Sequence, residues 1–444
     1  MKIDVITIEI GSTITKINAF NDIFSDSIKH IGQSTGLTSV DKGDVSLGVE
    51  EALENLKKDL GEDLEVGEYL INSSAAGGLR MAVFGLTYAM TARAAREASL
   101  GAGAIVEFVG TGKIQDFHLE DLYDTRPNII MLAGGLDHGD TEITLHNAKM
   151  LASSELDVPF IYSGNRQLQK SVRRLFEKNN KILHITKNVY PDVDQLDIDE
   201  ARKIIQHTFS EHIIHAKGME RLERYTSKEI IPTPYAVLTG AERLYKTLGD
   251  LVVIDVGGAT TDIHSVSEDS PENSPYRAQA TSLVKRTVEG DLGVFVNAKN
   301  LNDIEDNIDD FHTDLELLRP LPETEDEKNI TKELTAKAVS IGLRRHAGTK
   351  KVLYSPTGKK TLIYGKDLTQ VKYMIGTGGA LSRLENANNI LERIRDNQIE
   401  GSLLPQCNAK IMIDKKYIFS SIGTLAFHYK DANIEKLLKD HFRE

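Results

Sequence analysis

Tryptophan is absent from this chain of 444 residues, and aromatic residues make up only 6% of it. We therefore expect a core built from Leu, Ile, Val and Ala. Cysteine is scarce too, since Cys407 is the single one in the sequence. One cysteine excludes a disulfide framework and any four-cysteine zinc or iron–sulfur site supplied by one subunit. A single thiol is typical of a reducing compartment, which predicts a cytoplasmic protein.

Long apolar runs and an excess of basic charge are also missing. No run approaches the roughly 20 apolar residues that span a bilayer, and the N-terminus shows no basic region with a cleavage site. We therefore expect a soluble, intracellular protein with no membrane partner. The net charge is −13, from 53 Lys and Arg against 66 Asp and Glu. Because phosphate neutralisation needs a basic face, this charge argues against a nucleic-acid partner.

The chain does contain an alternation of strand patterns and helical spacings. Apolar, β-branched runs that stop at small residues predict strands over 3–10, 69–72, 128–132, 158–162, 251–255 and 371–376. Apolar residues at helical spacing predict helices between them, over 45–60, 90–98, 141–153 and 200–225. This alternation predicts an α/β fold with parallel or mixed sheets flanked by helices.

Two features organise the chain into larger parts. The break at 231–234 (Ile-Pro-Thr-Pro) marks a boundary, which predicts a first lobe over 1–230 and a second over 231–444. Acidic residues crowd 302–329, and we interpret 300–330 as an acidic, solvated helical insertion in the second lobe. Its apolar residues at helical spacing are Ile304, Ile308, Phe311, Leu315 and Leu318.

Two segments of the sequence share one pattern. Residues 9–16 and 255–262 each follow an apolar strand, begin with a carboxylate, have glycine two residues later and carry hydroxyl residues beyond it. Each half also has a strand that ends in a double glycine, at 134–135 and at 378–379. From the turn glycine to the first residue of the double glycine there are 123 residues in the first half (134 − 11) and 121 in the second (378 − 257). This agreement predicts two halves related by duplication.

Phosphate binding accounts for this pattern chemically. Glycine in a tight hairpin lets the backbone approach phosphate oxygens, which amide and hydroxyl groups then hydrogen-bond. Two facing hairpins can hold a triphosphate from both sides, with Glu9 and Asp255 directed at magnesium or its waters, because magnesium usually takes only one or two carboxylates. A single turn of this kind usually has no binding role, whereas the matched pair of turns favours an ATP site.

The sequence therefore predicts ATP and Mg²⁺ as cofactors. Glu9, Asp255 and Asp262 are the predicted catalytic residues, and Glu9 and Asp255 hold magnesium through water. Asp262 either orders the second hairpin or orients the attacking water. The predicted ATP-binding residues lie in three segments: Gly11, Ser12, Thr13, Thr15 and Lys16; Gly257, Gly258, Ala259 and Thr260; Gly376, Thr377, Gly378 and Gly379.

At these residues the sequence resembles the actin, sugar-kinase and heat-shock-chaperone superfamily. Residues 9–16 and 253–262 are similar to its two phosphate motifs, and 375–380 to its adenosine motif. The resemblance implies a duplicated actin-like (ribonuclease H-like) α/β fold, with mixed sheets flanked by helices and the nucleotide in a cleft between two lobes.

Further stretches resemble one narrower family, the MutL/GlmL-type ATPases associated with adenosylcobalamin-dependent glutamate mutase. These stretches are 73–79, 132–139, 286–293 and 344–348. The resemblance implies an ATP-dependent reactivating factor, a chaperone-like ATPase that releases damaged cobalamin from its mutase partner. That partner would be glutamate (methylaspartate) mutase, or an ornithine or lysine aminomutase. The sequence specifies neither the particular mutase, nor contact with cobalamin, nor the oligomeric state.

The chain departs from the family pattern at two places. Glu9 stands where Asp is expected, which predicts altered magnesium geometry or slow hydrolysis. The family's Ala-Gly-Gly-Thr-Asp-Gly-Gly becomes Ala-Gly-Gly-Leu-Asp-His-Gly at 133–139, so a role that depends on the replaced threonine or glycine is not carried over.

Three other functions fit parts of the sequence. A small-molecule kinase of the same superfamily would need a base such as Asp291, which is otherwise a turn residue. An electron-transferring activase would need paired cysteines, which Cys407 alone does not supply. An actin-like ATP-binding scaffold would keep the fold while assembly carried the function. His207, Glu211 and His215 have a metal-like spacing, which we interpret as a solvated helix face.

Overall fold

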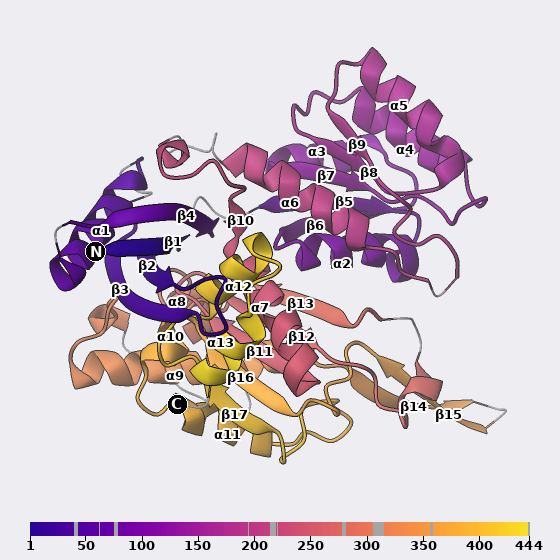
Figure 1. The fold of residues 1–444 in the computed structure, drawn as a ribbon. Coiled ribbons are helices and arrows are strands. Elements are labelled where there is room, and N and C mark those ends of the chain that lie inside the picture. The colour runs from indigo at the N-terminus through magenta and orange to yellow at the C-terminus, as the bar shows by residue number, and fades with distance from the viewer. Residues whose placement is uncertain are drawn as a thin grey trace. The chain divides into compact units, whose positions relative to one another are not determined.

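The structure is a computed structural model that describes residues 1–39, 43–61, 63–74, 79–193, 195–213, 219, 221–277, 281–304, 315–355 and 358–442. The chain separates into two compact units, each built around its own β-sheets (Figure 1). Unit 1 consists of Met1–Ala76, Lys217–Ala278 and Leu283–Glu444, and unit 2 consists of Gly77–Ala216 and Gln279–Ser282. The predicted lobe boundary at residue 230 stays a prediction.

The first sheet of unit 1 has the strand order β10-β4-β1-β2-β3. Strands β1 and β2 form an antiparallel hairpin, β3 continues it, and β4 lies parallel to β1 on the other side. Helix α1 (Ser46–Leu60) packs against β2 and β3. The strands are β1 (Lys2–Ile10), β2 (Ile14–Asn21), β3 (Lys29–Leu37), β4 (Glu65–Ser73) and β10 (Ile231–Pro232).

The second sheet of unit 1 has the order β13-β12-β11-β16-β17. Its β11–β12 hairpin is continued by antiparallel β13, and β16 lies parallel to β11 on the other side. The strands are β11 (Leu251–Val256), β12 (Thr261–Val266), β13 (Val284–Glu289), β16 (Tyr373–Thr377) and β17 (Lys410–Ile413).

The two sheets repeat one topology, because β4-β1-β2-β3 and β16-β11-β12-β13 have the same order and the same strand directions. The predicted duplicated actin-like α/β fold, with mixed sheets flanked by helices, is thereby confirmed. The strand that corresponds to β16 is β4, so our match of 134–135 with 378–379 was wrong. The spacing of 123 residues spans much of unit 2, which enters the chain directly after the first sheet's parallel strand.

Two helices join the sheets of unit 1. Helix α7 (Thr233–Leu248) packs on β11 and β12, α12 (Phe419–His428) packs on β1 and β4, and the two helices pack on each other. They approach closely at Gly423, where an added Cβ would collide with the backbone carbonyl of Ala236. One buried apolar cluster contains residues of both sheets, including Val5 and Val253.

A second core covers the outer face of the β11 sheet. Helix α9 (Glu325–His346) packs on β11 and β12 beside α10 (Gly378–Arg383) and α11 (Ala387–Asp396). The capping box of Thr324 and Glu327 begins α9. Between α8 (Ala298–Asp303) and α9 lies the predicted acidic insertion. Three of its apolar residues contact this core, namely Ile304, Leu315 and Leu318, whereas Ile308 and Phe311 lie outside the described residues.

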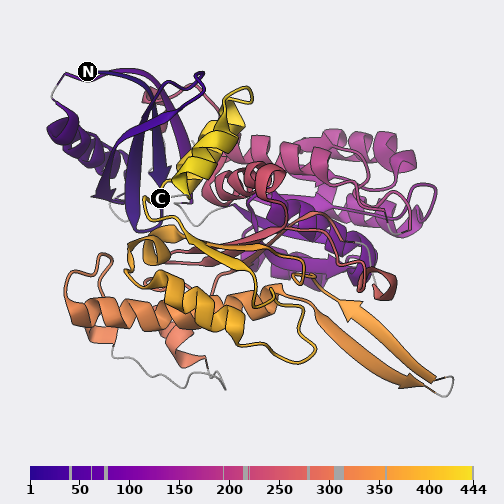
Figure 2. The ribbon, with the colours of Figure 1, turned by 60° about the horizontal axis from the view of Figure 1, so that its bottom comes forward.

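A two-stranded hairpin follows α9. It consists of β14 (Thr349–Ser355) and β15 (Gly358–Tyr364), which pair antiparallel. Figures 1 and 2 show the hairpin extending away from the other elements of unit 1. A C-terminal helix, α13 (Ile434–His441), returns to pack on α7 and α12.

Unit 2 is a parallel sheet of order β6-β5-β7-β8-β9 with helices around it. Its strands are β5 (Arg80–Gly85), β6 (Ile105–Thr111), β7 (Ile129–Leu132), β8 (Phe160–Tyr162) and β9 (Leu183–Ile185). Its α-helices are α2 (Arg93–Gly101), α3 (Asp116–Thr125), α4 (Glu142–Ala152), α5 (Gln169–Lys178) and α6 (Asp199–Ile213). On α6, His207 and Glu211 are exposed and 3.4 Å apart; His215 lies outside the described residues. In the part of the chain that the structure describes, no helix is long and apolar enough to cross a membrane.

Candidate nucleotide-binding site

Glu9 and Asp255 occupy equivalent positions near the ends of the two hairpins. Glu9 is paired with Lys16 across β1 and β2, and Asp255 is paired with Asp262 across β11 and β12. The first hairpin therefore presents a carboxylate beside an ammonium group, and the second presents two carboxylates. The cross-strand pairing gives a meaning to the different last residues of the two segments, Lys16 and Asp262.

The two turns are closed in the same way. The amide of Gly11 donates to the carbonyl of Ile14 at 3.0 Å, and the amide of Gly257 donates to the carbonyl of Thr260 at 2.9 Å. At Gly11 a Cβ would lie 2.8 Å from the Ile14 carbonyl oxygen. Glycine is required there because a side chain would not fit inside the turn.

The structure brings the three predicted segments together. A Cβ at Gly258 would lie 2.6 Å from Thr13 Oγ1, so the two turns meet. Gly378, with a φ of +87°, lies directly against the carboxylate of Asp255. The residues predicted for phosphate and adenosine binding therefore form one site within unit 1.

The first hairpin contains a buried ion pair. Lys16 Nζ lies 2.9 Å from Glu9 Oε2, and the two side chains are 1% and 8% exposed. Ser420 donates a hydrogen bond to the same Glu9 oxygen. Lys16 Nζ also lies 3.2 Å from the centre of the Tyr417 ring, a cation–π contact. Both groups of the pair are thus held by residues that precede or begin α12.

A buried carboxylate also fixes the adenosine segment. Thr377 Oγ1 donates to Asp414 at 2.8 Å. Asp414 accepts two more hydrogen bonds, from the backbone amides of Ile418 and Phe419, and pairs with His441 at 2.8 Å. Burial alone would raise the pKa of Asp414, but the hydrogen bond and charge of His441 bring that pKa below its usual value.

The second hairpin concentrates negative charge. Burial raises the pKa of Asp255 to about 8, and the charges of Asp262 and Glu9 act in the same direction while Lys16 opposes them. Such a donor set fits a divalent cation, whose charge would replace the proton. The described residues contain no group of three or more His, Cys, Asp or Glu side chains arranged to hold a metal.

Asp262 forms a buried ion pair with Arg286. Arg286 donates to Asp262 Oδ1 from Nε at 2.9 Å and from Nη2 at 2.5 Å. Thr260 Oγ1 donates to the other oxygen at 3.2 Å. These contacts favour the first of the two predicted roles for Asp262, the ordering of the second hairpin.

A loop after β13 holds the second turn from outside. The amides of Phe295 and Val296 donate to the carbonyl of Gly258 at 2.9 and 2.7 Å, and Asn297 Nδ2 donates to the carbonyl of Ala259 at 2.7 Å. Gly293 packs directly on the Ala259 carbonyl. The turn is therefore fixed through its carbonyl groups.

Two predicted residues face away from the site. Thr15 is fully buried, its hydroxyl lies 3.1 Å from that of Thr38, and it packs towards α1. Gly376 faces the outer core, where a Cβ would lie 2.8 Å from Ile413 Cδ1. Both serve packing in this structure, because alternate residues of a strand point to opposite faces.

Sequence reasoning missed three residues that hold the site, Asp414, Tyr417 and Ser420. A signal was present for Asp414, because it directly follows an apolar strand at 410–413, just as Asp255 follows the apolar run 251–254. The positions of Tyr417 and Ser420 carried no such signal, since only the packing of α12 on β1 brings them to Glu9.

Comparisons with known proteins identify the family of this chain. Residues 5–442 match the family model described as MutL protein. The chain is 34% identical to Protein MutL of Clostridium tetanomorphum over 455 residues, covering 97% of this chain and 98% of that protein. The chain therefore belongs to the MutL protein family.

Solved structures are more distant. A nucleotide-free acetone carboxylase is 14% identical with a TM-score of 0.40, covering 96% of this chain and 70% of that one. A nucleotide-free diol dehydratase-reactivating factor is 11% identical with a TM-score of 0.37, covering 96% and 99%.

Proposed function

We propose that the protein is an ATP-dependent reactivating factor that releases damaged cobalamin from an adenosylcobalamin-dependent mutase, with glutamate mutase as the first candidate. The observation that carries the proposal is the meeting of two equivalent hairpins, Gly258 against Thr13, with a carboxylate behind each turn. Membership of the MutL family supports the mutase partner.

Different backbone and side-chain groups of the site bind different parts of ATP. The amides and hydroxyls of residues 11–13 and 257–260 bind phosphate oxygens, and Lys16 offsets their charge. Glu9 and Asp255 hold Mg²⁺ through water, and Gly378 and Gly379 lie against the adenosine. When bound, Mg²⁺ neutralises charge that develops on the phosphates. Asp262 keeps the second turn in place through Arg286 and Thr260.

If ATP is to drive a change in the partner, the nucleotide must favour one conformational state of this protein over another. A ligand shifts a conformational equilibrium only by its difference in affinity for the two states. Because both hairpins contact the same phosphates, ATP favours the state in which they are closest, and hydrolysis removes that preference. We propose that the partner is held in one state and released in the other.

The kinase alternative finds less support. Asp291, its proposed base, accepts from Arg345 Nη1 at 2.9 Å with both carboxylate oxygens. Asp291 therefore has a structural partner in Arg345, as expected of a turn residue that positions the backbone.

The test is phosphate release from Mg-ATP without any acceptor, compared with that of Asp255→Ala. Half of the samples contain glutamate mutase inactivated with cyanocobalamin. We expect slow hydrolysis that the variant lacks, and recovery of mutase activity, after adding adenosylcobalamin, only with ATP. Hydrolysis without any recovery would leave an ATPase and refute the reactivating role.

A further inference from the structure

The β14–β15 hairpin is a basic segment of an acidic protein. Four lysines and no carboxylate lie between Thr349 and Tyr364, although the whole chain carries −13. Three of these lysines have described side chains, and all three are exposed: Lys350, Lys351 and Lys360. None of the three forms an ion pair with another described residue.

Apolar side chains accompany these charges. Val352 is 40% exposed and Tyr364 is 41% exposed. Beyond its base the hairpin extends from unit 1 as a two-stranded ribbon (Figure 2). Isolated two-stranded hairpins are only marginally stable in water. Lys350 and Lys351 lie 5.9 Å from the rings of Tyr276 and Tyr364, and they remain exposed to solvent. An extended ribbon with exposed basic and partly exposed apolar side chains is a surface suited to a partner.

The base of the hairpin is firmly anchored, in contrast to the exposed strands. The amide of Lys350 donates to the carbonyl of Gly401 at 2.7 Å, and the amide of Leu403 donates to that of Gly348 at 2.9 Å. Arg277 donates to the carbonyl of Gly365. The strands are therefore presented from a fixed base.

The hairpin is also connected to the second phosphate turn. It follows α9, whose Arg345 pairs with Glu289 at 2.8 Å and with Asp291 at 2.9 Å. These carboxylates flank the start of the loop that donates to the carbonyls of Gly258 and Ala259. One charged side chain, Arg345, and the C-terminal end of α9 therefore lie between that turn and the hairpin.

We propose that β14–β15 is the docking arm for an acidic surface of the mutase partner. The inference rests on the reactivating role proposed above and adds the surface that recognises the partner. Opposite charges on two protein surfaces accelerate association and select the partner. The apolar Val352 and Tyr364 then supply contact area that water leaves on binding.

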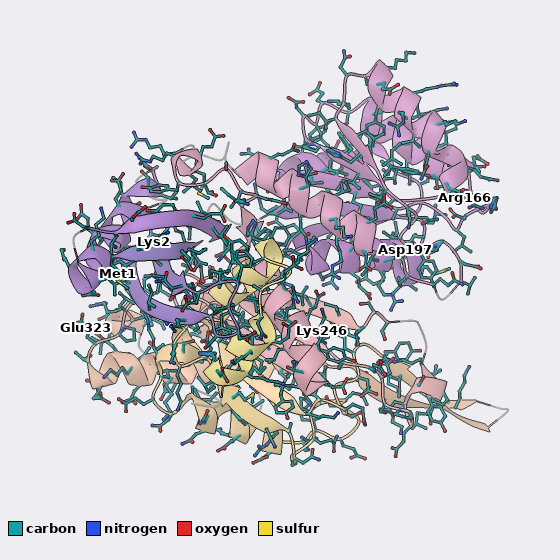
Figure 3. All side chains as sticks on the ribbon, viewed as in Figure 1. Met1, Lys2, Arg166, Asp197, Lys246 and Glu323 are labelled. Atoms are coloured by element: carbon teal, nitrogen blue, oxygen red, sulfur yellow. The ribbon has the colours of Figure 1, made fainter. Side chains whose placement is uncertain are left out.

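Two other occupants fit the chemistry less well. Nucleic acid would be repelled by the net charge of −13. A second copy carries the same net charge and is repelled at long range. The acidic surface that a second copy offers is the N-terminal end of α9, near Glu323 (Figure 3), which lies on the side of unit 1 away from the hairpin.

The test reverses the three described lysines, in Lys350→Glu/Lys351→Glu/Lys360→Glu. The matched control reverses three exposed cations of α5 in unit 2, in Lys170→Glu/Arg173→Glu/Arg174→Glu. Both change the net charge by −6, so they separate the hairpin from a general charge effect. Binding to cyanocobalamin-inactivated glutamate mutase is measured by biolayer interferometry at 50 and 300 mM NaCl, beside basal phosphate release.

We expect the hairpin variant to bind the mutase at least about tenfold more weakly at low salt, with basal hydrolysis unchanged and the control like wild type. Equal loss in both variants, or none in the hairpin variant, overturns the docking arm while the reactivating role stands. Wild type that neither binds nor reactivates the mutase refutes both proposals. Self-association or DNA binding that the hairpin variant alone loses, with mutase binding unchanged, assigns the arm to another occupant and also overturns the inference.

Arg345→Gln tests the connection to the phosphate turn. We expect this variant to bind the mutase like wild type but to lose any increase in phosphate release that the mutase causes. An increase equal to that of wild type would show that Arg345 does not link the arm to the ATP site.

Discussion

Lys16 and Glu9 form a buried ion pair, 2.9 Å apart, beside the turn of the first hairpin. We predict that Lys16→Met lowers the free energy of unfolding by about 3 kcal/mol, because it leaves a buried carboxylate without its cation. The double variant Glu9→Gln/Lys16→Met should recover most of this loss. Urea unfolding of the two variants measures the difference, and equal losses would show that the unpaired charge is not the cause.

His30 makes the protein sensitive to acid. Burial, followed by the nearby charges of Lys416 and His441, lowers the pKa of His30 from 6.5 to about 4. Below pH 6.5 the unfolded chain therefore binds a proton that the folded protein excludes. Stability is full above pH 6.5 and falls as the pH drops towards 4, by up to about 3 kcal/mol for this group.

The variant His30→Gln should remove this share of the pH dependence. Its free energy of unfolding is measured against wild type between pH 4 and 8. His264 and His346, whose pKa values burial lowers well below 6.5, keep part of the acid sensitivity in both proteins. Parallel curves for wild type and variant over this range would refute the assignment to His30.

The sequence was sufficient to predict the two hairpins but not the residues that contact and hold them. Glu9 and Asp255 were predicted because a strand, a carboxylate and a glycine turn are local features, which neighbouring residues determine. Ser420 lies more than 400 residues from Glu9, and its role depends on how α12 packs. The insertion of unit 2 was also hidden, because a double glycine follows its strand β7, as another follows β16. A chance agreement in spacing then supported the wrong match.

Asp414 joins the adenosine segment to the C-terminal helix. We predict that Asp414→Ala destabilises the protein by about 3 kcal/mol, since Thr377, His441 and two backbone amides lose their acceptor. Asp414→Asn keeps the shape and one acceptor oxygen, so its loss should be smaller. Thermal unfolding ranks the two variants, and a milder effect for alanine than for asparagine would contradict this account.

Gly293 and Gly290 stand three residues apart and face opposite constraints. A Cβ at Gly293 would overlap the backbone carbonyl of Ala259, whereas a Cβ at Gly290 meets no atom within 4 Å. Because backbone cannot yield as a flexible side chain can, Gly293→Ala must displace the second phosphate turn. We predict that it weakens ATP binding at least about tenfold, the equivalent of 1.4 kcal/mol, while Gly290→Ala binds like wild type. Titration with a fluorescent ATP analogue checks both, and unchanged affinity in Gly293→Ala would separate this loop from the nucleotide site.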